Sequence, residues 1–196
     1  MIGVKRIFPE CHADTLLVKL ILQRGSPVHY EGIPNVAIAM KKITSTNVII
    51  IGVVDDDKYE TLPTFIREFK PIPNESYIAS HGLTFDGNSH ELVDFIQSHR
   101  KTIEQQNLII LQYPGTQKYL IKLKPAFEKW LLATGRVCNI HLEDTKYKGH
   151  FKKFRDDAKD SEVYFNTELK KFINSIVLAN PPAIETLKFW LNKALG

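Results

Sequence analysis

Cysteine is scarce in this chain, and long uninterrupted apolar stretches are missing. Only Cys11 and Cys138 occur among 196 residues, which excludes a disulfide framework and a zinc site built from several cysteines. The longest predominantly apolar run, residues 48–54, is far shorter than the roughly 20 residues that span a bilayer. The N-terminal residues lack the charged-then-apolar order of a signal peptide. We therefore expect a protein of the reducing cytoplasm without membrane segments.

Neither sign of charge is in large excess, but the two signs are unevenly distributed. Residues 1–100 contain 10 Lys or Arg and 12 Asp or Glu, whereas residues 101–196 contain 16 and 10. The net charge of +4 is therefore carried by the second half. This asymmetry is compatible with a metal site followed by a surface that binds polyanions, and equally with the ordinary variation of solvated helices.

Apolar spacing alternates between strand and helix over the first 115 residues. The β-branched run 48–54 predicts a strand buried on both faces. Shorter strands are predicted at 3–8, 28–30, 76–80 and 107–112, with helices between them. Helical spacing then dominates at 118–134, 161–178 and 183–195, with an irregular polar segment at 139–160. We expect an α/β core over 1–115 with a mainly parallel, Rossmann-like sheet flanked by helices, and a mainly helical extension over 116–196 packed on it.

Three carboxylates follow two of the predicted strands. Glu10 follows the first strand, and Asp55 and Asp57 follow the long buried one. Side chains alternate along a strand, so Asp55 and Asp57 point one way and Asp56 the other. Parallel strands end at one sheet edge, so neighbouring strands would bring all three acids together. Because bare anions repel one another, such a cluster favours bound Mg²⁺ or Mn²⁺, whereas the simpler interpretation is solvated acids at strand ends.

The order of these residues resembles the TOPRIM family, the domain of topoisomerases, bacterial primases and OLD-type nucleases. The segment Phe8–Asp14 precedes an apolar helix, Gly32–Val36 opens a second helix, and Ile49–Asp57 ends in Asp-x-Asp. The resemblance covers residues 1–80 and extends at most to residue 112. It implies a TOPRIM fold, Glu10 as general acid or base, Asp55 and Asp57 as Mg²⁺ ligands, and Asp14 as a further acidic position. Cys11 stands where the family usually has glycine.

Two other features bear on binding. His81 follows a predicted strand and is an auxiliary candidate for the same sheet edge, although a lone histidine is more often a surface residue. Residues 146–155 interleave cations with aromatic rings. Cations contact phosphates and rings stack on unpaired bases, which makes Lys148, Lys152, Lys153 and Arg155 candidate nucleic-acid contacts. The alternative is a solvated connector that its phenylalanines attach to the core.

The sequence leaves two functions open. The first is a Mg²⁺-dependent enzyme acting on phosphodiester bonds of DNA or RNA, of nuclease or nucleotidyl-transfer type. The second is a non-catalytic TOPRIM-like module with a regulatory or protein-binding role, for example alongside a separate ATPase. The presence of Cys11 where the family usually has glycine favours this second function. A response-regulator receiver would need paired acids after the first strand, where Glu10 stands without a second acid at its side.

Overall fold

The structure is a computed structural model that describes residues 6–23, 27–45, 48–56, 62–71 and 107–195. Its centre is a five-stranded mixed sheet with the strand order β1-β2-β5-β4-β3. The strands are β1 (Ile7–Pro9), β2 (Ile50–Asp55), β3 (Lys70–Pro71), β4 (Leu108–Gln112) and β5 (Lys118–Leu123). β2 is parallel to both β1 and β5, whereas β4 is antiparallel to its neighbours β5 and β3. The fold is therefore α/β, with a sheet that is only partly parallel.

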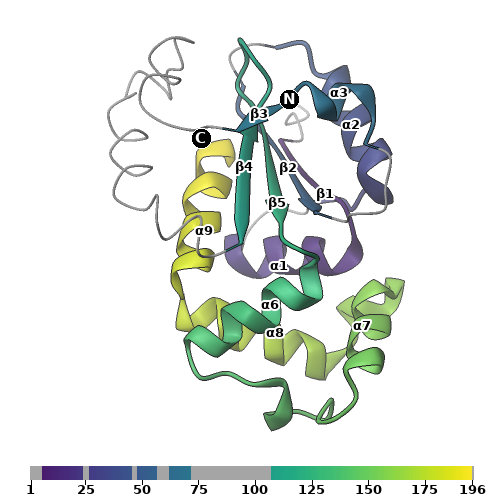
Figure 1. The fold of residues 1–196 in the computed structure, drawn as a ribbon, viewed down its shortest axis with the longest axis vertical. Coiled ribbons are helices and arrows are strands. Elements are labelled where there is room, and N and C mark those ends of the chain that lie inside the picture. Colours follow the sequence, from purple (N-terminus) through teal and green to yellow (C-terminus); the bar gives the residue numbers. More distant parts are fainter. Residues whose placement is uncertain (1–5, 24–26, 46–47, 57–61, 72–106, 196) are drawn as a thin grey trace.

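Helices cover the sheet on both faces (Figure 1). One face packs against α2 (Gly32–Lys42) and the short α3 (Thr64–Arg67), forming the smaller core. The other face packs against the larger core, which includes side chains of α1 (His12–Leu22), α6 (Phe127–Val137), α7 (Phe151–Lys159), α8 (Thr167–Ala179) and α9 (Pro182–Leu195). Two short 3-10 helices, Leu142–Asp144 and Ser161–Tyr164, connect the helices around α7. None of the helices in the described ranges combines the length and the apolar character needed to cross a membrane.

The central strand β2 explains how the carboxylates are positioned. Residues 50–54 are fully or almost fully buried because helices cover both faces of the strand. Alternate residues divide between the two cores, with Ile51 and Val53 in the larger and Ile50 and Val54 in the smaller. By the same alternation, Asp55 faces the larger core, on the side of α1 and α6. The predicted buried parallel strand is confirmed.

The largest departure from the expected secondary structure is β5. Lys118–Leu123 was predicted as the start of a helix reaching residue 134, but it is a strand between β2 and β4. The helix begins only at Phe127. The sheet therefore continues beyond residue 115, where we expected the α/β core to end, and it is mixed rather than mainly parallel.

Smaller differences have local causes. Residues 28–30 are not a strand, although the Tyr30 N–H donates to the Pro9 carbonyl at 3.0 Å along the edge of β1. The second helix starts at Gly32 rather than near Asn35, and the segment expected to be irregular contains α7. The strand expected at 76–80, the helix expected after it, and the residues Asp57 and His81 lie outside the described residues.

Candidate active site at the carboxyl ends of β1 and β2

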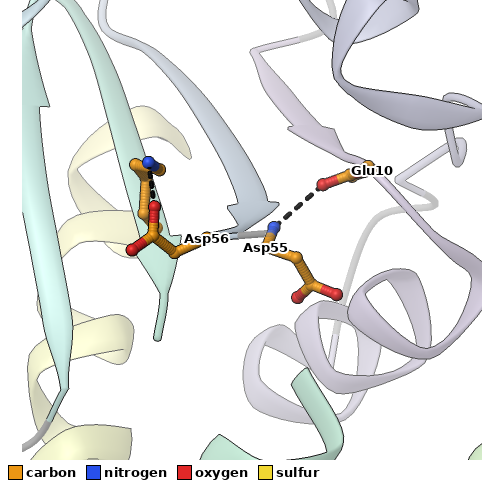
Figure 2. Close-up of polar contacts among 4 residues, drawn as sticks. Glu10, Asp55 and Asp56 are labelled. Atoms are coloured by element: carbon orange, nitrogen blue, oxygen red, sulfur yellow. Dashed lines mark hydrogen bonds and ion pairs between the residues drawn. The ribbon is translucent and has the colours of Figure 1, made fainter. Parts of the chain in front are cut away.

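Glu10 and Asp55 meet at the carboxyl ends of two neighbouring parallel strands. The Glu10 N–H continues the strand pairing by donating to the Val53 carbonyl at 2.9 Å. The Glu10 side chain then reaches across to β2, where its Oε2 accepts the backbone N–H of Asp55 at 2.8 Å (Figure 2). The expected adjacency of the first strand and the long buried strand is thus observed, and it brings two of the three candidate acids together.

The Asp55 carboxylate points away from that of Asp56. Asp55 Oδ1 accepts the backbone N–H of Phe127, the first residue of α6, at 2.8 Å. Asp56 lies on the other side of the chain and forms an ion pair with Lys122 of β5 (Figure 2). Since the N-terminus of a helix carries partial positive charge, α6 stabilises the ionised form of Asp55. The alternation expected for Asp55 and Asp56 is observed.

Asp14 lies in the same acidic cluster and is buried completely. Cys11 is the N-cap of α1: its Sγ accepts the Asp14 N–H at 3.3 Å, and Asp14 Oδ2 accepts the Cys11 N–H at 3.2 Å. Asp14 Oδ1 is buried and has no hydrogen-bond partner among the described residues. A buried carboxylate oxygen without a partner is unfavourable unless a proton or a cation satisfies it.

Burial and neighbouring acids raise the pKa of Asp55 and of Asp14. Burial, together with the charges of Glu10 and Glu128, raises the pKa of Asp55 to about 7 against the opposing effects of the Phe127 N–H and Lys159. Burial likewise raises the pKa of Asp14 well above its ordinary value, with contributions from Asp55 and Glu10. The cluster therefore binds protons more tightly than isolated carboxylates do, and any cation that enters it would displace them.

The donor set fits a hard divalent cation in its chemistry. Glu10, Asp55 and Asp14 offer carboxylate oxygens, the ligands that Mg²⁺ and Mn²⁺ prefer, and Asp14 Oδ1 is a buried oxygen lacking a partner. Within the ranges that the structure describes, no three His, Cys, Asp or Glu side chains are arranged around a common point for a metal ion. Asp57, the expected third ligand, is outside those ranges.

The candidate nucleic-acid residues lie on and just before α7. Lys148, Lys152, Lys153 and Arg155 are all exposed. The aromatic rings between them divide into two groups, because Tyr147 and Phe154 are buried in the larger core while Phe151 is exposed. Two of the three rings therefore attach this segment to the core, and Phe151 alone is accessible for stacking.

Several groups around the site were not predicted from the sequence. Glu128, the Phe127 amide and Lys159 all act on Asp55, and each belongs to the C-terminal helices. The sequence carries one usable signal for α6, since an acid such as Glu128 is favoured in the first turn of a helix. Nothing in the sequence indicates that this turn faces the end of β2.

Comparison with known proteins adds no independent identification. No protein-family model, no curated protein and no solved structure matches this chain.

Proposed function

We propose that this chain carries out Mg²⁺-dependent phosphodiester chemistry on nucleic acid, as a nuclease or nucleotidyl-transfer enzyme with a TOPRIM-like site. One observation carries the proposal: Glu10 and Asp55 come from strands 45 residues apart in sequence and are joined by a 2.8 Å hydrogen bond at the carboxyl edge of the sheet. Ligands of α/β proteins collect at this edge.

Each acid has a distinct proposed role. Asp55 and Asp57 would hold the cation, with Glu10 as a further ligand, and the ion would neutralise the charge that develops on the phosphate. Glu10 moves a proton to or from the reacting oxygen, since its carboxylate is oriented by the Asp55 N–H. The Phe127 N–H fixes Asp55 through Oδ1, and a carboxylate has a second oxygen with which to bind metal. Asp14 and His81 are auxiliary in this scheme.

The nucleic acid would lie along the basic side of the C-terminal helices. Lys159 at the end of α7 is close enough to lower the pKa of Asp55, so α7 borders the acidic cluster. The exposed Lys148, Lys152, Lys153 and Arg155 precede Lys159 on the same segment. They provide the positive charge that phosphate groups require near a cluster of acids.

The test combines metal binding with cleavage of labelled DNA and RNA. We expect Mn²⁺ to bind in calorimetry, and Asp55→Asn to weaken that binding strongly. Glu10→Gln is expected to lower the cleavage rate by about 10²–10⁴-fold, the usual contribution of a general acid or base. Asp56→Asn is the matched control, because this neighbour points away from Asp55 and pairs with Lys122. Cleavage that persists in folded Asp55→Asn and Glu10→Gln proteins would reject this site.

A second function is favoured by a separate observation. Asp55 Oδ1 already accepts a hydrogen bond from α6, and the Cys11 side chain serves as the N-cap of α1 beside the cluster. Both contacts suit a non-catalytic module in which the acids stabilise the fold and the surface binds a protein partner. Calorimetry separates the two functions, since a module of this kind would bind no Mn²⁺ at millimolar concentration.

A further inference from the structure

A pocket on the other face of the sheet is not used by the acidic cluster. It has a volume of about 630 Å³ and lies between α2 and the segment that precedes it, within the size range of small-molecule sites. We propose that this pocket binds one unpaired base of a single-stranded nucleic acid, with the adjoining phosphate on Lys42. The substrate class rests on the proposed function, whereas the pocket itself does not.

The walls of the pocket suit a flat ring. Phe8 and Tyr30 line it with their ring centroids 5.2 Å apart, and Ile38 adds an apolar side chain that is 53% exposed. Phe8 is buried, while Tyr30 is only partly buried and presents the accessible ring. Aromatic faces bind unpaired bases by stacking, irrespective of sequence.

The polar groups of the pocket suit the edge of a base. His29 lines the pocket, and its Nε2 is buried with no hydrogen-bond partner among the described residues. The His29 ring is held in place by the His12 ring, with the centroids 3.7 Å apart. The Asn35 Nδ2 donates a hydrogen bond to the Glu31 carbonyl at 2.6 Å. The amide oxygen of Asn35 therefore points away from Glu31 and can accept a hydrogen bond from a ligand. The Asn35 amide oxygen thus gives the pocket a hydrogen-bond acceptor for the edge of a base.

The position of the pocket connects it to the acidic cluster. The Tyr30 N–H donates to the Pro9 carbonyl at 3.0 Å, so the pocket wall is attached to the residue immediately before Glu10. Phe8 and Glu10 are two strand residues apart, roughly 7 Å along the backbone, so the pocket and the acidic cluster adjoin the same strand end although they open on different faces of the sheet. Lys42 is exposed at the end of α2 and supplies the cation for a phosphate.

The test measures binding without catalysis. Fluorescence anisotropy of a labelled single-stranded DNA and of a matching RNA, in EDTA, reports affinity in the absence of cleavage. We expect Tyr30→Ala to weaken binding about tenfold or more, as for the loss of one stacking contact, and Tyr30→Phe to retain it. Ala39→Leu, which fills the pocket from α2, is expected to have the same effect as Tyr30→Ala.

Matched controls separate the pocket from general charge. Lys42→Ala is expected to weaken binding and reduce its salt dependence, whereas Lys41→Ala changes an equally exposed neighbour that does not line the pocket. Urea unfolding of each variant verifies the fold. Wild-type affinity in Tyr30→Ala and Ala39→Leu, or equal effects of Lys41→Ala and Lys42→Ala, would overturn the proposal.

The outcomes also distinguish this proposal from the proposed function. Binding that depends on Tyr30 without cleavage in Mg²⁺ would support the base-binding pocket and reject the proposed enzymatic function. Cleavage that depends on Glu10 and Asp55, together with normal nucleic-acid binding by the pocket variants, would support the enzymatic function and reject the base-binding pocket. A short peptide that binds the wild type but not Tyr30→Ala, while nucleic-acid affinity is unchanged in Tyr30→Ala, identifies a protein ligand and rejects the base.

Discussion

Asp55 is held between groups that oppose each other. The Phe127 N–H and Lys159 favour the ionised form of Asp55, while burial, Glu10 and Glu128 favour the protonated form. The second group has the larger effect, since the pKa rises to about 7. An acid that is protonated in the absence of metal and ionised in its presence couples metal binding to proton release. The pH dependence of the stability of the metal-free protein therefore reports directly on the protonation of Asp55 in the cluster.

The stability of the metal-free protein is expected to fall as pH rises from about 4 to about 7. The pKa of Asp55 is raised from its ordinary 3.8 to about 7 in the folded state, so the folded protein holds a proton that the unfolded chain has released. The stabilisation is complete below pH 4 and is lost as pH rises through 7. The loss is about 2–4 kcal/mol, measurable by urea unfolding in EDTA at each pH.

Asp55→Asn is the control for this dependence. The amide does not titrate, so the slope between pH 4 and 7 becomes shallower. The contribution of Asp14, whose pKa is also raised, remains, and His12, whose pKa burial lowers, acts in the opposite direction. Asp56→Asn should keep the wild-type slope. A wild-type protein whose stability is constant over this range would contradict the burial of the cluster.

The sequence predicts the strand-end acids well and their surroundings poorly. Glu10 and Asp55 follow from two rules, alternation along a strand and the common edge of parallel strands, and these rules need only local patterns. Glu128 and Lys159 come from helices far along the chain, and their approach to Asp55 depends on how those helices pack. No local pattern contains that information.

At the scale of elements, β5 shows why a buried strand can be mistaken for a helix. Leu120, Leu123 and Phe127 recur at helical spacing. In the fold, Tyr119, Ile121 and Leu123 face the larger core and Leu120 faces the smaller one. A strand covered on both faces has no polar face, so the alternation that identifies strands is lost. The turn at Gly115 and the proline at 125 are the only local signs of its ends.

Close packing of β2 against α2 depends on Gly52. A Cβ at this position would lie 2.8 Å from both Leu120 Cδ1 and Met40 Sδ, and 3.2 Å from Val36 Cγ1. Overpacking costs about 1–3 kcal/mol, more than the roughly 0.4–1 kcal/mol gained by reducing the freedom of the unfolded chain. Gly52→Ala is therefore expected to lower the free energy of unfolding by about 1–2 kcal/mol in urea titrations.

A double-mutant cycle verifies this cause. Met40→Ala removes one of the two nearest atoms, so adding Gly52→Ala to that variant should cost less than adding it to the wild type. Strict additivity of the two substitutions would show that Gly52 is required for a reason other than contact with α2.

At the scale of the whole molecule, the two halves of the sequence share one core. The larger core combines Leu17 of α1 and Val53 of β2 with Trp130 of α6 and Trp190 of α9. Trp190 packs on Tyr119 of β5 with the ring centroids 4.8 Å apart. β5 lies between β2 and β4. Separation of the C-terminal helices from the sheet would therefore expose the core that they share.

The protein is therefore expected to unfold in a single transition. Its two tryptophans, Trp130 and Trp190, both lie in the C-terminal helices, so their fluorescence reports on the surroundings of those helices, whereas circular dichroism reports on the whole chain. The two signals should share one urea midpoint. The sharper test uses Gly52→Ala, which acts in β2 and touches α2, far along the chain from either tryptophan. In a single cooperative unit it lowers the fluorescence midpoint as much as the dichroism midpoint. A fluorescence midpoint left unchanged by Gly52→Ala would mean that the helices form an independent domain, and the acidic cluster, which joins β1 and β2 to α6 through Asp55, would then lie at a domain boundary rather than within one core.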